Sequence, residues 1–315
     1  MKLIGLYDAS ASEMNRTAGL FVASCGYEER SSASLKILKG SIKDRFVFSF
    51  SENQDALHRQ DNDKKFDSAQ FQSIKASGGD ARLVRHSISR MLTNPALSAL
   101  AVDISSMTRP WHGAIVSALR NSHRKTSIEV YFVYVPAVYR KPPEQISPLE
   151  QVGPVEGFAS FAPPTLPVAL VLGLGYERER AIGLQELLDP RMTSLMIPHS
   201  GPDDKFFASV TSSNSEILSR TGPQWIFEYP LNSPLGSFRL LESLCLGLER
   251  KYRVVLASLG PKLFGVICLL LSTVHPQLSV WRITSGAMGS PRDVTGDLAN
   301  VVVCRTVWEP ETTPS

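Results

Sequence analysis

Short runs of consecutive apolar residues alternate along this chain with longer segments in which apolar residues recur every three or four positions. The continuous runs predict strands, and the spaced segments predict helices. In the first half, the predicted strands cover 19–24, 45–50, 82–84, 99–105 and 128–135. The predicted helices of that half begin at Glu28 and cover 67–76 and 109–121.

The second half of the chain repeats this alternation. Its predicted strands cover 168–172, 194–197, 225–229, 253–258 and 278–283, with a last, antiparallel strand at 300–304. Its predicted helices cover 177–188, 204–220, 237–251 and 262–273. Strands that alternate with helices and are apolar throughout are typical of a parallel sheet covered on both faces. We therefore expect an α/β fold with two tandem Rossmann-like parallel-sheet domains related by internal duplication.

The duplication can be read directly from the sequence. The segment 25–30, Cys-Gly-Tyr-Glu-Glu-Arg, is followed 149 residues later by Leu-Gly-Tyr-Glu-Arg-Glu. Three further pairs of segments follow in the same order at offsets between 149 and 152: 46–50 with 195–198, 106–113 with 258–265, and 128–134 with 278–284. This period is far too long for a solenoid repeat, so each copy should have its own core. The predicted organisation is repeat 1 at 1–140, an ordered proline-rich linker at 141–167, and repeat 2 at 168–315.

Two of the repeated motifs follow the first and the fourth predicted strand of each copy. In the common strand order 3-2-1-4-5, these two strands are neighbours at the point where the winding of the sheet reverses. Ligands of open α/β sheets bind outside the carboxyl ends of the strands at this switch point. We therefore expect the two loops to converge on one binding crevice in each copy.

The loop after the first strand has the sequence Gly-Tyr-Glu in both copies: Gly26, Tyr27 and Glu28, then Gly175, Tyr176 and Glu177. Glycine permits a sharp turn, and a carboxylate in the first helical turn is favoured by the helix dipole. Two interpretations carry equal weight. In one, the carboxylate accepts hydrogen bonds from ribose hydroxyls or an exocyclic amine. In the other, the glutamate caps its own helix and the tyrosine packs over the edge of the sheet.

The loop after the fourth strand places small hydroxyl residues and then a cation at the start of a helix. Its candidate ligand-binding residues are Ser105, Ser106, Thr108 and Arg109 in the first copy, and Ser258, Gly260 and Lys262 in the second. Backbone N–H groups, hydroxyls and a cation at a helix start together suit a phosphate group. The alternative for the hydroxyl residues is ordinary N-capping of the helix.

Asp103, at the end of the fourth strand, is the leading candidate for a catalytic carboxylate, and Glu28 is the second. Asp103 could equally hold Arg109 in place, and the second copy has Val255 at its position. No cofactor is identified. The histidines lack metal-binding spacing, and Arg178 occupies the third glycine position of a dinucleotide fingerprint.

Composition is that of an ordinary soluble globular protein, with 43% hydrophobic and 20% charged residues. The longest apolar stretch, 263–271, is too short to span a bilayer, so no membrane partner is expected. The net charge of +3 divides into +5 for 1–150 and −2 for the remainder. No aromatic residues alternate with the basic clusters, so nucleic acid is a possible but unsupported partner. The scattered cysteines predict buried, reduced thiols in a cytoplasmic protein: Cys25, Cys245, Cys268 and Cys304.

The segment 103–109, Asp-Ile-Ser-Ser-Met-Thr-Arg, resembles the motif that follows strand four in the CRISPR-associated Rossmann fold (CARF) sensors. The resemblance covers the architecture of both halves, but only these few residues closely. It implies recognition of a cyclic oligonucleotide or related nucleotide in prokaryotic antiviral defence. The chain departs from the family in two respects, since Gly-Tyr-Glu is not its usual first motif and no effector domain follows. The resemblance therefore implies an effector supplied by a partner protein.

Three functional hypotheses follow from these features. The first is a sensor or regulatory subunit that binds a nucleotide-like anionic small molecule. The second is a nucleotide-cleaving enzyme, either a phosphodiesterase or a glycosyl-cleaving enzyme, with Asp103 or Glu28 as the general base. The third is a scaffold protein of a multi-protein complex.

Overall fold

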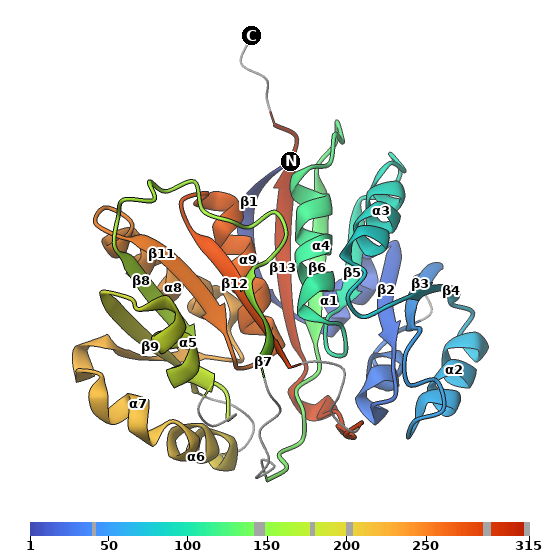
Figure 1. The fold of residues 1–315 in the computed structure, drawn as a ribbon. Coiled ribbons are helices and arrows are strands. Elements are labelled where there is room, and N and C mark those ends of the chain that lie inside the picture. The colour runs from blue at the N-terminus through green and yellow to red at the C-terminus, as the bar shows by residue number, and fades with distance from the viewer. Residues whose placement is uncertain (40–41, 142–148, 177–179, 200–203, 286–290, 312–315) are drawn as a thin grey trace. The chain divides into compact units, whose positions relative to one another are not determined.

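The computed structural model comprises two compact units, each built around one sheet (Figure 1). The structure describes residues 1–39, 42–141, 149–176, 180–199, 204–285 and 291–311. Unit 1 contains Met1–Val138 and Ser290–Ser315, and unit 2 contains Tyr139–Gly289. The second unit is therefore inserted between two parts of the first.

The sheet of unit 1 has seven strands in the order β1-β13-β6-β5-β2-β3-β4. Their bounds are β1 Lys2–Ala9, β2 Leu20–Cys25, β3 Asp44–Phe50, β4 Gln72–Ala76, β5 Ala99–Asp103, β6 Ile128–Tyr134 and β13 Val302–Glu309. The strands from β6 to β4 are parallel, and β13 is antiparallel to both of its neighbours. The helices are α1 Ala11–Thr17, the 3₁₀ helix η1 Glu29–Lys36, α2 Arg59–Ser68, α3 Ala81–Leu92, α4 Arg109–Arg120 and the 3₁₀ helix η3 Leu298–Asn300.

The sheet of unit 2 has six strands in the order β10-β9-β8-β11-β12-β7. Their bounds are β7 Leu149–Pro154, β8 Val168–Gly173, β9 Met192–His199, β10 Ile226–Pro230, β11 Arg253–Ser258 and β12 Ser279–Ser285. All of them are parallel except β7, which is antiparallel to β12. The helices are α5 Arg180–Leu188, α6 Asp204–Ser213, α7 Ser215–Arg220, the 3₁₀ helix η2 Pro223–Trp225, α8 Pro234–Leu248 and α9 Lys262–Val274.

The parallel parts of the two sheets share one topology, which confirms the predicted α/β class with two Rossmann-like units. Counted within each unit, the parallel strands follow the order 3-2-1-4-5 in both sheets. Strands one and four are therefore adjacent, β2 beside β5 and β8 beside β11. Every residue of β2 and β5 is buried, as expected for strands with helices on both faces.

The helices of unit 1 cover both faces of its sheet. On one face, Met14 of α1 and Phe66 of α2 join a core that includes Phe21 and Ala23 of β2. Figure 1 shows α3 and α4 packed side by side along the sheet. Leu20 and Val22, the alternate residues of β2, are also buried, because side chains alternate between the faces of a strand. The central strand β2 thus contributes to two apolar layers.

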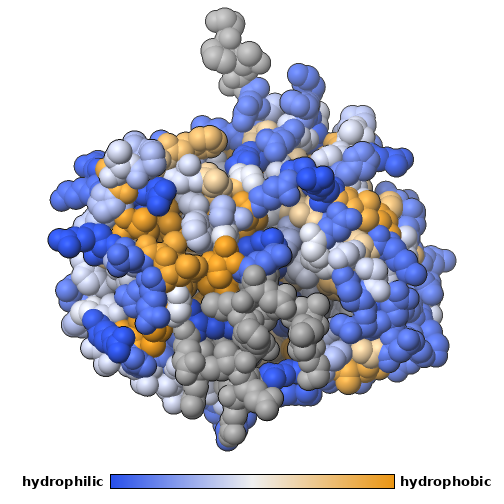
Figure 2. All heavy atoms as spheres, viewed as in Figure 1, coloured by the Kyte–Doolittle hydropathy of each residue, from blue (hydrophilic) through white to orange (hydrophobic). Residues whose placement is uncertain are grey.

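The helix predicted at 67–76 is wrong, because α2 ends at Ser68 and Gln72–Ala76 is strand β4. Of the residues that α2 buries, Arg59 and Asn62 are polar, and Phe66 is apolar. A helix without an apolar stripe gives no helical periodicity in the sequence. Figure 2 shows hydrophilic residues over the surface where α2 lies.

The strand predicted at 82–84 is also wrong, because this segment lies in helix α3. Val84, Ile88 and Leu92 are buried at a spacing of four, which is a clear helical stripe. Asp80 caps the helix by accepting a hydrogen bond from the backbone N–H of Leu83. The helical pattern is therefore visible in the sequence when the window extends to Leu92, but not within the three residues 82–84.

Two strands lie in sheets to which the predicted domain boundaries did not assign them. Strand β13 was expected in repeat 2, but it lies between β1 and β6 in the sheet of unit 1. Strand β7 lies in the segment expected to be a linker, and it pairs with β12. Strand β1 and helix α1 were not predicted. Local periodicity shows that a segment is a strand, but not which sheet it joins.

The rest of the linker packs on unit 2. Val155 and Phe158 are buried. The N–H of Val155 donates to the carbonyl of Val280, whose own N–H donates to the carbonyl of Phe158. The proline-rich segment is thus ordered where the structure describes it.

Candidate functional site

The two repeated loops of unit 1 meet at the switch point of the sheet. The first loop, residues 26–28, follows β2, and the second loop, residues 104–108, follows β5. The hydroxyl of Ser106 donates to Oε2 of Glu28 at 3.2 Å, which joins the two loops directly. The side chain of Glu28 is 21% exposed, so this carboxylate remains accessible from solvent. The convergence expected from the strand order is present.

Arg30, which the sequence analysis did not select, is the cation of this cluster. Its Nη2 donates to Oε2 of Glu28 at 3.1 Å, and its side chain is only 7% exposed. Burial opposes the charge of the guanidinium, but Glu28, Tyr134 and Asp103 outweigh this effect and raise the pKa of Arg30. A buried arginine between carboxylates stays charged, and it compensates charges that would otherwise be isolated.

Asp103 lies at the bottom of the cluster and is 2% exposed. Its Oδ1 accepts a hydrogen bond from the backbone N–H of Ser105 at 2.9 Å, so it fixes the start of the second loop. Burial raises the pKa of Asp103, and the hydroxyls of Ser105 and Ser34 and the charge of Arg30 oppose that shift. In this geometry Asp103 holds the start of the second loop and interacts electrostatically with Arg30.

Two of the hydroxyl residues proposed to bind a ligand already form hydrogen bonds with backbone groups of the fold. Ser105 is completely buried, and its Oγ accepts a hydrogen bond from the backbone N–H of Val135 at 2.8 Å. Thr108 is the N-cap of α4, where its Oγ1 accepts from the N–H of Trp111 and donates to the carbonyl of Gly78 at 2.7 Å. The N-capping interpretation therefore holds for Thr108. Arg109 follows as the first residue of α4 and is half-buried.

The first loop is held by a second feature that the sequence analysis missed, the start of α2. Asn62 is fully buried, and its Nδ2 donates to the carbonyls of Gly26 at 2.9 Å and Glu28 at 2.8 Å. The backbone N–H of His58 donates to the carbonyl of Tyr27 at 3.1 Å. All three carbonyls of the loop are thus bound, and its conformation is set by a helix that lies thirty residues further along the chain.

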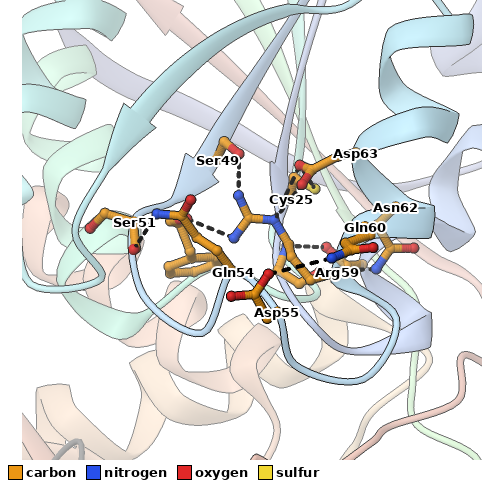
Figure 3. A network of polar contacts seen from close by, with 12 residues as sticks. Cys25, Ser49, Ser51, Gln54, Asp55, Arg59, Gln60, Asn62 and Asp63 are labelled. Atoms are coloured by element: carbon orange, nitrogen blue, oxygen red, sulfur yellow. Dashed lines mark hydrogen bonds and ion pairs between the residues drawn. The ribbon is translucent and has the colours of Figure 1, made fainter.

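Arg59 ties the same helix to the ends of the strands (Figure 3). Its Nε donates to both carboxylate oxygens of Asp63, at 3.1 and 3.0 Å, and its Nη1 and Nη2 donate to the carbonyl of Phe50 and the hydroxyl of Ser49. The thiol of Cys25 at the end of β2 donates to Asp63. Burial and the carboxylate of Asp63 raise the pKa of Cys25, so its thiol stays protonated and is not a nucleophile.

All four cysteines are buried and free of disulfides, as predicted. Burial raises the pKa of Cys245, Cys268 and Cys304 as well. They behave as small apolar side chains of the core.

A segment that returns from unit 2, residues 291–298, lies against the start of η1. Asp293 Oδ1 accepts from the N–H of Glu29 at 2.9 Å, and the N–H of Arg30 donates to the carbonyl of Val294 at 2.8 Å. The hydroxyl of Thr295 donates to Oε2 of Glu29 at 2.7 Å. This return segment therefore caps the 3₁₀ helix that carries Arg30, a contact that no local pattern could reveal.

Serine side chains tie the 3₁₀ helix η1 to the end of β2 and to the first loop. The hydroxyl of Ser31 donates to the carbonyl of Ser24 and accepts from the N–H of Gly26. Ser32 and Ser34 are buried in the same turn. Short hydroxyl side chains that bind nearby backbone groups are unfavourable in regular α-helices.

In unit 2, the two repeated loops touch through their backbones. A Cβ at Gly175 would lie 2.2 Å from the carbonyl oxygen of Leu259, and a Cβ at Gly260 would lie 2.4 Å from that of Leu174. Both positions therefore require glycine, because any side chain would collide with the other loop. This close approach explains both glycines without reference to a ligand.

A buried asparagine also holds the glycine of the first loop in unit 2, and we call this arrangement the asparagine clamp. Nδ2 of the buried Asn214 donates to the carbonyl of Gly175 at 2.6 Å, as Asn62 does to Gly26 in unit 1. The two asparagines follow their glycines by 39 and 36 residues. Because these spacings differ, the constant offset between the repeats did not reveal the pair. The clamp extends the internal similarity beyond the four repeated segments.

The remaining candidates of unit 2 are Tyr176, Glu177, Ser258 and Lys262. The ring of Tyr176 packs edge-on against that of Phe206, with the ring centroids 5.3 Å apart, which fits the packing interpretation of this tyrosine. Ser258 is 6% exposed, and its hydroxyl has no partner among the described residues. Lys262 is the first residue of α9 and is half-buried. Glu177 lies outside the described residues.

Replacing Asn62 with alanine is expected to lower the free energy of unfolding by about 1–3 kcal/mol, because two buried carbonyls lose their donor. Urea unfolding followed by circular dichroism would measure this loss. The control is Asn121→Ala at an exposed helix end, which should change stability by less than about 0.5 kcal/mol. Equal effects of the two variants would contradict the clamp.

Among the described residues, no cluster of histidine, cysteine, aspartate or glutamate could hold a metal ion. None of the helices in the described part of the chain is long and apolar enough to cross a membrane. A comparison with models of known protein families gave no match, and neither did a comparison with curated proteins.

Proposed function

We propose that the protein is a sensor or regulatory subunit that binds a nucleotide or another phosphate-bearing ligand at the switch point of unit 1. The observation that carries this proposal is the hydrogen bond between Ser106 and Glu28, which joins the loops after strands one and four. This is the edge at which sheets of this topology bind ligands. The placement in prokaryotic defence, with an effector supplied by a partner protein, rests on the resemblance of 103–109 to the CARF motif.

The charges at this point favour an anionic ligand. Arg109 stands at the start of α4, where the positive end of the helix dipole adds to its charge. The carboxylate of Glu28 is paired with Arg30 at 3.1 Å, so its charge is largely compensated and does not repel an anion. Its exposed part suits a ribose hydroxyl, which would donate to the carboxylate.

The proposal places the ligand in unit 1 rather than unit 2. Asp103 corresponds to Val255 at the repeat offset and to Ala257 by the pairing of the strands, and both of these residues are buried and apolar, so no carboxylate occupies that position. Tyr176 is also held by Phe206. The switch point of unit 2 therefore supports packing of the two glycine loops more than recognition of a charged ligand.

Binding is favoured over the alternative of nucleotide cleavage. A general base must reach the proton that it removes. Asp103 is 2% exposed and bonded to the N–H of Ser105, and Glu28 already accepts from Arg30 and Ser106. Asp103 therefore lacks the access that a base in hydrolysis needs, and Oε2 of Glu28 already accepts two hydrogen bonds. Nucleotide turnover by the wild type that is lost in Asp103→Asn would reverse this preference.

The first experiment is mass spectrometry of small molecules extracted from the purified protein, together with a thermal-shift screen of mono-, di- and cyclic nucleotides. For a nucleotide that stabilises the protein, Arg109→Ala is expected to weaken binding by about 1.5–3 kcal/mol, the value of a charge-assisted hydrogen bond. Isothermal titration calorimetry would measure the change.

The matched control is Arg90→Ala, which removes the same charge from the exposed end of α3 and should leave affinity unchanged. Equal affinity of wild type and Arg109→Ala would contradict the site. A clean extract and no thermal shift with any nucleotide would favour the scaffold hypothesis.

A further inference from the structure

Unit 1 carries a groove of about 600 Å³ between η1 and α2, closed on one side by the return segment. This volume lies within the range of small-molecule binding pockets, roughly 300–1,000 Å³. The groove is lined by residues of η1 and α2, by Ala69, and by Gly296 and Leu298 of the return segment. Neither Ser106 nor Arg109 lines it, so it is a separate feature from the proposed ligand site.

The floor of the groove is apolar. Ala33 is buried, and Leu35 and Ala69 pack against the hydrophobic core of unit 1. Leu298 of the return segment adds a further apolar wall. Such a floor favours a ligand with an apolar part, because the apolar surface that the ligand removes from water contributes favourably to the free energy of binding.

The rim of the groove is cationic. Lys36 at the end of η1 and Lys64 and Lys65 on α2 line it, and all three are exposed. Within the described part of the chain, none of them forms an ion pair, and the ammonium of Lys65 donates only to the hydroxyl of Ser32 at 3.4 Å. Glu29, the acidic residue in the lining, is bonded to Thr295. An anion in the groove would therefore meet three lysine ammonium groups that form no ion pair with a carboxylate of the described residues.

We propose that this groove is a binding site for a small organic anion with an apolar part. The anionic group would lie between the lysines of η1 and α2, and the apolar part would lie on Ala33, Leu35 and Leu298. The three lysines form a compact set around one pocket rather than an extended basic stripe, which favours a small anion over a nucleic acid. This site is independent of the proposed nucleotide site.

A suitable probe is 8-anilinonaphthalene-1-sulfonate, because it joins a sulfonate to an apolar ring system and fluoresces in apolar surroundings. We expect the wild type to show one saturable binding event in a fluorescence titration. The variant Lys36→Gln/Lys64→Gln/Lys65→Gln should bind the probe at least about tenfold more weakly. N-phenyl-1-naphthylamine, which lacks the sulfonate, should bind both proteins equally.

The control is Lys2→Gln/Lys75→Gln/Lys251→Gln, which removes the same charge from exposed positions outside the groove. A second variant, Leu298→Glu, brings a carboxylate into the wall of the groove and should weaken the sulfonate probe while the melting temperature stays close to that of the wild type. Arg109→Ala should leave probe binding unchanged, so failure of the nucleotide site and of the groove are distinguishable. Equal binding by the wild type, the groove variant and the control, or no saturable binding by the wild type, would overturn the proposal.

Discussion

Replacing Arg30 with methionine is expected to lower the free energy of unfolding by about 3–5 kcal/mol near neutral pH, the usual cost of removing one partner from a buried ion pair. Methionine fills a similar volume, so the loss comes mainly from charge. Glu28 would lose its 3.1 Å partner, and the buried Asp103 would lose the nearby positive charge that opposes the rise of its pKa. Urea unfolding would measure the difference from the wild type.

The loss of stability caused by Arg30→Met should depend on pH. Burial raises the pKa of Asp103 in the folded protein, so its contribution to stability is fully present below the pKa of the unfolded state. That contribution is lost as pH rises through the folded pKa. Without Arg30 this folded pKa rises further, so the loss caused by Arg30→Met should be smaller at about pH 4.5 than at about pH 7.

Two further variants separate this effect from a general loss of packing. Asp103→Asn keeps an acceptor for the N–H of Ser105 but cannot ionise, so near neutral pH Arg30→Met/Asp103→Asn should be more stable than Arg30→Met alone. Arg82→Met on the exposed surface of α3 should change stability by less than about 0.5 kcal/mol. A loss that is independent of pH and of Asp103 would show that charge compensation is not the role of Arg30.

Replacing Gly260 with alanine is expected to destabilise unit 2 by about 3 kcal/mol, the upper end of the usual cost of overpacking. The new methyl group would lie 2.4 Å from the carbonyl oxygen of Leu174, which is backbone and cannot rotate away. The two loops would have to separate, and the carbonyl of Gly175 could lose its bond to Asn214. Differential scanning calorimetry would report the loss as a lower melting temperature.

The matched control is Gly247→Ala near the end of α8, where an added Cβ meets no atom within 4 Å. Alanine is a better helix former than glycine by roughly 0.8–1.0 kcal/mol, so this variant should be neutral or more stable. Opposite effects of the same chemical change would establish that the loops after β8 and β11 are in contact. Equal melting temperatures for the two variants would refute that contact.

The sequence predicted where the two loops of unit 1 meet, and it predicted some of the residues that join them. Ser106 and Glu28 were selected from the repeat, and the structure joins them at 3.2 Å. Ser105 and Thr108 were selected for their hydroxyls, but both hydroxyls bind backbone groups of the fold. A hydroxyl near a helix start fits a cap and a phosphate site equally well in sequence, and only the position of its neighbours distinguishes them.

Arg30 and Asn62 were missed for a related reason. Arg30 has no counterpart in the repeat, since Glu179 stands at the same offset. Asn62 lies in a helix so polar that it gave no helical pattern, and its counterpart Asn214 follows at a different spacing. Buried polar residues are defined by the groups that they bind, and those groups lie far away in the chain.

The sequence by itself determined the class of the fold, the presence of two similar units, and the strands and loops that form each switch point. It could do so because buried parallel strands are continuous apolar runs and because the two copies still share their glycine and helix-start motifs. Only the tertiary structure decided that β13 completes the sheet of unit 1, that the return segment caps η1, and that Arg30 and Asn62 organise the first loop. Periodicity reports which face of a segment is buried, but the partner that buries it is chosen by long-range packing.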